Sequence, residues 1–227
     1  TLNIPEKTNV MMCLRAKIMD DLTLKFLESH ENPMVLHLGC GLDSRFERVG
    51  SPKAKWFDLD FEEVISLRRT FFEETGQYHM LGGSVTDPRW MDALPGNAAE
   101  ALVIAEGLLM YLKEAQVRQL IQRLAATLGS FTLIFDAFST LTARNVGRHP
   151  SLKKTGAQVY WGIDDPRDFE AYGHSIRFES EHFLTQMPLI QGLSPGLRLA
   201  FRISSLFLTA KRAHRILVYR VGNSEAP

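Results

Sequence analysis

The spacing of apolar residues divides the chain into alternating helices and short strands. Residues 8–29 carry apolar side chains at helical spacing between charged ones, which predicts a long helix. After Pro33, short and mostly apolar runs recur, each long enough for a strand but too short for a helix. We expect strands at residues 34–38, 55–60, 77–81, 101–105, 131–135 and 214–221.

Helices are expected between these strands, at residues 61–75 and 113–128. The second of them has Val117, Leu120 and Leu124 on one face, and Gly129 stands where a C-cap glycine is usual. Because helices alternate with strands that are apolar throughout, the pattern favours a mainly parallel sheet covered on both faces. The predicted fold is a doubly wound, Rossmann-like α/β sheet of about seven strands.

The length of 227 residues fits a single domain. Residues 1–30 are expected to form an N-terminal helical segment. Residues 137–173 interrupt the rhythm of helices and strands, and residues 183–210 contain a strongly apolar helix at 197–208. We expect both of these segments to be insertions that form a cap on the substrate side, over the carboxyl edge of the sheet.

Charge and cysteine content exclude several classes of protein. Lys plus Arg and Asp plus Glu number 26 each, so no basic surface is expected for nucleic acid or an anionic membrane. No apolar run is long enough to cross a bilayer, and Cys13 and Cys40 give neither a disulfide framework nor a metal-type spacing. We therefore expect a cytoplasmic protein without a metal, nucleic-acid or membrane partner. The sequence does not indicate its oligomeric state.

A turn with two glycines follows the first predicted strand, within VLHLGCGLDSRFERV at residues 35–49. In an open parallel sheet, ligands bind beyond the carboxyl ends of the strands, and glycine lets a ligand approach the backbone closely. We therefore expect Gly39, Cys40 and Gly41 to contact a ligand. The turn lacks the third glycine of the dinucleotide fingerprint, so an ordinary strand-to-helix turn is an equal alternative.

Acidic residues follow two other predicted strands. Asp60 lies about twenty residues past the glycines, where a carboxylate accepts hydrogen bonds from ribose hydroxyls. Asp60 is also a natural N-cap for the next helix, whereas Asp58 is expected to point inward as support. Glu106 follows a buried strand, where a charge requires a cation or a ligand. We expect Glu106 to receive a ligand ammonium or to pair with Arg15 or Arg45.

Three motifs resemble the leucine carboxyl methyltransferase family, in this order: LHLGCGLDSRFERV, WFDLDFEEVISLRR and VIAEGLLMYL. The family includes the tetracenomycin-type polyketide O-methyltransferases, and its small-molecule branch fits better than the phosphatase-methylating branch. The resemblance extends from about Arg15 to Leu128, and more weakly to the last strand. It implies the class I methyltransferase fold, with S-adenosylmethionine as cofactor and S-adenosylhomocysteine as product.

The resemblance also implies a role for individual residues. Arg15 matches the arginine that grips the methionine carboxylate, since a guanidinium fork suits that group. Gly39 matches the glycine packed against the cofactor, and Asp60 matches the acid that binds the ribose. Glu106 matches the acid near the methionine amino group, and Tyr111 falls near a tyrosine on the substrate side.

The chain departs from the family pattern beside the adenine. Many members have an aspartate there, whereas this chain has Ser84. We expect Ser84 and the backbone of Val85 to contact the adenine ring, with Asp87 as compensation. The family's N-terminal cap is expected to be missing or shortened.

The predicted function is S-adenosylmethionine-dependent O-methylation of a small molecule, such as a polyketide-like hydroxyl or carboxyl. A phenol acceptor benefits from a base and a carboxylate needs none, so no general base is assigned. Tyr111 is the candidate catalytic residue. Other candidates near the mouth are Asp136, His149, His174 and residues 161–165. Tyr160 and Trp161 either shape an aromatic acceptor pocket or pack within the cap.

Three other functions remain as alternatives. A protein C-terminal carboxyl methyltransferase has the same expected cofactor and is not distinguished by the neutral charge. A binding module without turnover would not need Arg15, Gly39, Asp60 and Glu106 together. A nicotinamide oxidoreductase is disfavoured by the incomplete glycine fingerprint.

Overall fold

The structure, a computed structural model, describes residues 5–96, 100–146, 156–173 and 175–222. These residues form a seven-stranded sheet with the order β3-β2-β1-β4-β5-β7-β6. All paired strands are parallel except β7, which is antiparallel to β5 and β6. The strands are β1 Met34–Leu38, β2 Lys55–Asp60, β3 Tyr78–Gly82, β4 Ala101–Ala105, β5 Phe131–Phe138, β6 Ile176–Phe183 and β7 His214–Val221. Strand order reverses between β1 and β4, so the ligand crevice of this architecture lies beyond their carboxyl ends.

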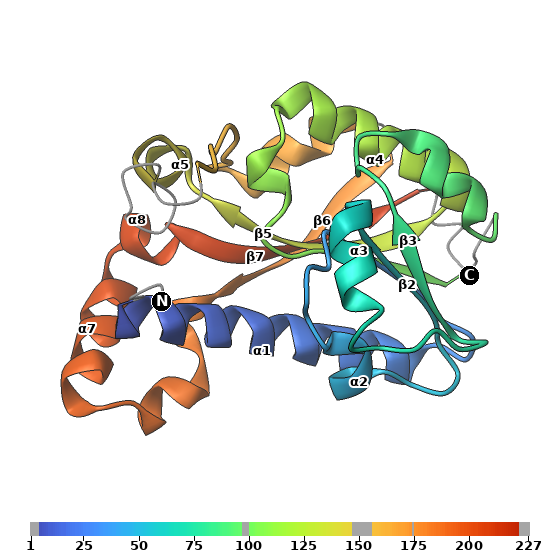
Figure 1. The fold of residues 1–227 in the computed structure, drawn as a ribbon. Helices are drawn as coiled ribbons and strands as arrows, with labels where there is room; N and C mark the ends of the chain where they lie inside the picture. The colour runs from blue at the N-terminus through green and yellow to red at the C-terminus, as the bar shows by residue number, and fades with distance from the viewer. Residues whose placement is uncertain (1–4, 97–99, 147–155, 174, 223–227) are drawn as a thin grey trace.

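Helices cover both faces of the sheet, as the apolar strands predict (Figure 1). Successive strand residues serve opposite faces: Val35 packs in the core under α1, and Leu36 packs in the core under α4. One face carries α1 Glu6–Ser29, α2 Arg45–Val49, α3 Glu62–Arg68 and α7 Pro195–Leu206. The other carries α4 Glu114–Leu128 and the 3-10 segments η1 Pro88–Ala93 and η3 Pro166–Tyr172. The predicted doubly wound α/β fold is therefore confirmed.

Several short helices gather at the end of the sheet where β5 ends and β7 begins (Figure 1). They are α5 Thr140–Val146, α7 and α8 Leu208–Lys211. The 3-10 segments η4 Leu184–Gln186 and η5 Pro188–Gly192 connect β6 to α7. These elements belong to the two segments expected as insertions, and their role as an acceptor cap stays a prediction. No helix in the described ranges is long and apolar enough to cross a membrane.

The helix expected at residues 61–75 is shorter in the structure, where α3 covers only Glu62–Arg68. The chain then turns back early toward β3. Two hydrogen bonds close that return: Thr75 N donates to Tyr78 O at 2.9 Å, and Met80 N donates to Glu74 Oε1 at 2.7 Å. The expected strand at 77–81 is shifted by one residue.

The apolar pattern did not predict strand β6 or helix α5. The edge strand β6 has polar or charged side chains at five of its eight positions, so it lacks the apolar run that predicts the other strands. Helix α5 is short and has one buried residue, Ala143, so its sequence carries little amphipathic signal.

Candidate active site

The turn after β1 has the backbone geometry that its glycines suggest. Gly39 and Gly41 have φ of 64° and 52°, a left-handed conformation that favours glycine. The Gly39 and Cys40 N–H groups both donate to Leu59 O, at 2.8 and 3.1 Å, so β2 holds the turn in place. A Cβ on Gly39 would lie 3.0 Å from Leu108, whereas a Cβ on Gly41 would meet no atom within 4 Å. Gly41 therefore faces open space from which a ligand can approach.

Asp60 lies at the end of β2, beside this turn. Its carboxylate accepts the Gly41 N–H and the Phe61 N–H, each at 2.7 Å. The N-cap of α3 is Phe61, so the N-cap interpretation of Asp60 is wrong, although the carboxylate does bond to the N–H at that helix end. Asp60 is half-buried, and each oxygen has one described hydrogen-bond partner. A carboxylate can accept two bonds on each oxygen, so Asp60 keeps acceptor capacity for a ligand.

Glu106, immediately after β4, is held by two arginines. Arg15 Nε lies 2.7 Å from one of its oxygens and Arg45 Nη2 lies 2.5 Å from the other. Both of the arginines proposed from the sequence therefore pair with this acid. Arg45 is fully buried, while the Glu106 side chain keeps 11% of its surface exposed. Glu106 thus meets the requirement that a charge after a buried strand finds a cation.

Arg15 connects Glu106 to a second acid, Asp136 in β5. Its Nη1 lies 2.9 Å from Asp136 Oδ2. Burial alone would lower the pKa of Arg15, but the attraction of Asp136 and Glu106 outweighs it and raises that pKa. Among the described residues, no acceptor is bonded to the remaining nitrogen, Nη2. Arg15 is therefore a fixed cation with the two N–H bonds of its Nη2 atom still available for a ligand.

Asp136 is fully buried and carries three hydrogen bonds. Oδ1 accepts the Gly107 N–H at 2.5 Å, and Oδ2 accepts from Arg15 and lies 2.7 Å from His214 Nε2. Burial would raise the pKa of this carboxyl, but Arg15, His214 and the Gly107 N–H hold it well below its usual range. Asp136 is therefore an anion at the carboxyl end of β5.

A cavity of about 370 Å³ lies between α1 and the turn after β1. Four predicted cofactor residues meet there, from segments far apart in the sequence: Arg15, Gly39, Cys40 and Glu106. Burial raises the pKa of the Cys40 thiol, so it stays neutral and serves as an apolar wall. The other lining residues are Met12, Cys13, Ala16, His37, Asp43 and Arg48.

Ser84 and Val85 do not line that cavity. Ser84 Oγ lies 2.9 Å from Thr86 Oγ1, and Val85 packs against the core under α4. A separate hollow of about 300 Å³ lies nearby, lined by Gly82, Gly83, Asp87, Arg89 and Trp90. Asp87 accepts the Arg89 N–H at 3.1 Å and pairs with its guanidinium, so it caps η1. The compensating adenine contact expected of Asp87 stays a prediction.

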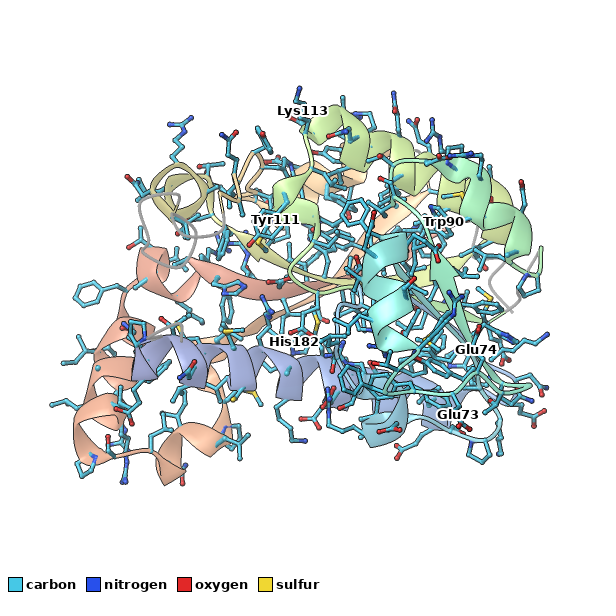
Figure 2. All side chains as sticks on the ribbon, viewed as in Figure 1. Glu73, Glu74, Trp90, Tyr111, Lys113 and His182 are labelled. Atoms are coloured by element: carbon cyan, nitrogen blue, oxygen red, sulfur yellow. The ribbon has the colours of Figure 1, made fainter. Side chains whose placement is uncertain are left out.

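Tyr111 lies in η2 Leu109–Tyr111, on the side of the sheet that also carries Trp90 (Figure 2). Burial and the nearby Asp136 raise the pKa of its phenol, which therefore stays protonated. Tyr160 N and Trp161 N both donate to Met110 O, at 2.9 and 3.3 Å, which brings residues 160–161 beside this segment.

The other candidates near the mouth differ in where the structure places them. Trp161 is buried and donates to Tyr172 OH at 2.9 Å, so it packs within the protein, whereas Tyr160 is 55% exposed. His149 and His174 lie outside the described residues. His214, which no sequence pattern singled out, places its Nε2 2.7 Å from Asp136 Oδ2.

Comparison with known proteins places this geometry in a family. The family model for leucine carboxyl methyltransferase matches residues 3–125, more than half of the chain. The chain belongs to the leucine carboxyl methyltransferase family. It is 35% identical over 210 residues to the tetracenomycin polyketide synthesis O-methyltransferase TcmP of Streptomyces glaucescens, covering 92% of this chain and 77% of TcmP. It is 29% identical over 189 residues to the S-adenosyl-L-methionine-dependent methyltransferase dpfgK of Gibberella zeae, covering 77% of this chain and 63% of dpfgK.

Solved structures of methyltransferases share the fold at low sequence identity. A putative methyltransferase from Thermobifida fusca superposes with a TM-score of 0.65 at 11% identity, over 96% of this chain and 82% of that one. Magnesium protoporphyrin IX methyltransferase of Synechocystis PCC 6803, solved with S-adenosylmethionine bound, superposes with a TM-score of 0.59 at 11% identity, over 98% of this chain and 86% of that one. The fold is therefore that of the class I methyltransferases. Together with the family, it makes the protein a transferase that uses S-adenosylmethionine as methyl donor.

The residues at the sheet edge fit this cofactor. Gly41 leaves open space beside the backbone, and Asp60 keeps acceptor capacity for ribose hydroxyls. Arg15 keeps an N–H group for a carboxylate, and Glu106 supplies a negative charge for an ammonium. The assignment of each residue to one part of the cofactor stays a prediction.

Proposed function

We propose that the protein methylates an oxygen atom of a small, polyketide-like or other secondary metabolite, either a hydroxyl or a carboxyl group. The observation that supports this most is the 35% identity with TcmP over 92% of the chain. A cytoplasmic location and a small-molecule acceptor are parts of the same proposal. The family's own description names leucine carboxyl groups, so a protein C-terminal carboxylate is the second candidate.

In this proposal, three side chains at the carboxyl edge of the sheet orient the cofactor. Asp60 binds the ribose hydroxyls, Arg15 binds the methionine carboxylate through Nη2, and Glu106 faces the amino group. Gly39, Cys40 and Gly41 form the floor against which the cofactor lies. Ser84 and Val85 contact the adenine.

S-adenosylmethionine supplies, when bound, a methyl group that is activated by a positively charged sulfur. The protein's task is therefore to hold the acceptor oxygen in line with that methyl group and to exclude water. We propose that Tyr111 assists on the acceptor side. Because its raised pKa keeps the phenol protonated, Tyr111 acts by donating a hydrogen bond rather than as a base.

Calorimetry and methyl transfer test this function. S-adenosylhomocysteine should bind the protein and NAD should not. With S-adenosylmethionine labelled on the methyl group, the label should pass to an aromatic probe such as 2-naphthol or 2-naphthoic acid, and not to a peptide with a C-terminal leucine. Binding of NAD alone would contradict the cofactor assignment. Labelling of the peptide alone would favour protein carboxyl methylation instead.

A further inference from the structure

His214 and Asp136 form a pair at the edge of the sheet that carries the candidate site. His214 begins β7 and lies opposite Phe138 of the antiparallel strand β5. Its Nε2 lies 2.7 Å from Asp136 Oδ2, the same oxygen that accepts from Arg15. The imidazole is therefore one carboxylate away from the arginine that borders the cavity and binds Glu106.

The ionised state of Asp136 determines which nitrogen of His214 carries the hydrogen. An anionic carboxylate only accepts hydrogen bonds, so the short contact requires a hydrogen on Nε2. In the neutral ring the lone pair then lies on Nδ1. Within the part of the chain that the structure describes, no residue is hydrogen-bonded to Nδ1.

The environment of His214 holds the ring in place without covering it. The ring packs against Phe138 with the two centroids 4.6 Å apart, and 12% of the side chain is exposed. A carboxylate on one nitrogen, an aromatic neighbour and a free lone pair on the other nitrogen are the arrangement of an oriented histidine base.

We propose that His214 is the general base that accepts the proton of a hydroxyl acceptor, and that Asp136 is the positioning residue that fixes its tautomer. This inference depends on the proposed function. The acceptor oxygen forms a bond to the methyl carbon while the carbon–sulfur bond breaks and its electron pair stays on sulfur. The hydroxyl proton moves to Nδ1 of His214, and the negative charge of Asp136 balances the imidazolium until the proton leaves to water.

Other side chains near the edge are less suited to this role. Tyr111 is protonated, and the lowered pKa of Asp136 makes that acid a weak base. Both oxygens of Glu106 are already bonded to arginines. His37 borders the cavity but is only 1% exposed, and its two ring nitrogens face protein groups, Nε2 at 3.3 Å from Arg45 Nη1 and Nδ1 at 3.5 Å from Asp58 Oδ1.

His214→Gln tests the proposal, with His182→Gln as the matched control. His182 is a half-buried histidine on the neighbouring strand β6, bonded to Ser180, and it plays no part in the candidate site (Figure 2). In His214→Gln, kcat for 2-naphthol should fall by about 100-fold or more, because a positioned base contributes at least that factor. The dissociation constant of S-adenosylhomocysteine and kcat for 2-naphthoate, which needs no base, should change less than about twofold. His182→Gln should leave all three values unchanged.

Nitrogen-15 NMR of ligand-free protein gives a readout that needs no acceptor. Neutral His214 should carry its hydrogen on Nε2, and Asp136→Asn should shift it toward Nδ1. A hydrogen on Nδ1 in the unaltered protein would overturn the proposal, as would full 2-naphthol turnover by His214→Gln. If the unaltered protein methylated neither 2-naphthol nor 2-naphthoate, that result would instead contradict the proposed function. That outcome would leave the tautomer measurement to decide the state of His214.

Discussion

Two clusters of buried charge flank the turn after β1, and they differ in whether protein groups enclose them. The closed cluster consists of Asp58, Arg68, Tyr78 and Trp56. Asp58 Oδ1 accepts from Trp56 at 2.8 Å, and Oδ2 accepts from Arg68 and Tyr78 at 2.5 and 2.7 Å. Every charged member is at most 1% exposed. This arrangement stabilises the packing of α3 and β3 on β2 and leaves no group for a ligand.

The open cluster consists of Arg15, Arg45, Glu106 and Asp136. It is also paired throughout, but it borders a cavity, and the side chains of Arg15 and Glu106 keep 18% and 11% of their surface exposed. A buried charge in a closed network serves stability, whereas a charge with spare bonding capacity beside a cavity serves binding. Asp58 and Asp60 show a similar contrast within β2. Asp58 belongs to the closed cluster, whereas Asp60, two residues further on, keeps acceptor capacity for a ligand.

Asp58→Asn should give the largest loss of stability. The asparagine leaves the buried Arg68 guanidinium without its counter-charge, which should lower the free energy of unfolding by about 3–5 kcal/mol. Urea denaturation followed by circular dichroism measures this. The matched control is Asp60→Asn on the same strand, with an expected change below about 1 kcal/mol. Equal losses for the two variants would show that the enclosed Asp58 stabilises the protein no more than Asp60, which keeps acceptor capacity for a ligand.

Arg15→Ala, a substitution in the open cluster, should weaken the binding of S-adenosylhomocysteine. Loss of a charge-assisted hydrogen bond of about 1.5–3 kcal/mol should weaken S-adenosylhomocysteine about 10- to 100-fold. The affinity for adenosine, which lacks the carboxylate, should stay the same. Calorimetry with both ligands measures the difference, and Lys17→Ala on the exposed side of α1 is the control. Equal weakening of both ligands would show that Arg15 does not bind the amino-acid end.

Gly39→Ala should cost about 1–2 kcal/mol of stability, because a residue other than glycine is strained at its positive φ. The new methyl group would also press on Leu108 at 3.0 Å. The control is Gly76→Ala, where no atom lies within 4 Å of the added Cβ and no left-handed φ is present. Thermal denaturation of the two variants should show a lower midpoint for Gly39→Ala alone. Equal midpoints would mean that the turn adapts without strain.

Acidification should lower the free energy of unfolding, through Asp58 in the closed cluster and Asp136 in the open cluster. Burial opposes ionisation of Asp58 and Asp136, yet their partners hold the pKa of each carboxyl below its ordinary value. The folded protein therefore binds fewer protons than the unfolded chain, so this stabilisation is complete above about pH 4 and is lost progressively at lower pH. Unfolding measured between pH 7 and pH 3 should show the decline. Asp58→Asn should show a smaller decline than the unaltered protein.

The core strands were predictable because most of their positions are apolar and buried on both faces, as in Ala101–Ala105. The edge strand β6 was not, since its outward positions are polar. The end of α3 was also missed, because Phe71 and Phe72 extend the apolar pattern although Phe71 is 65% exposed.

The site was predictable where its residues follow strands directly. Gly39, Asp60 and Glu106 each come at or just after the end of a strand, so their approximate location follows from the topology. The contact between Asp136 and His214 joins residues 78 positions apart and depends on the register of antiparallel β7 against β5. No local pattern carries that register, so the pair emerges only from the structure.

The most direct test of the cofactor site is calorimetry of S-adenosylhomocysteine with Asp60→Ala. If Asp60 binds the ribose, loss of two charge-assisted hydrogen bonds should weaken the ligand by about 100-fold or more, while circular dichroism shows an unaltered fold. An affinity equal to that of the unaltered protein would contradict the account, because the cofactor would then not lie across the carboxyl ends of β1 and β2.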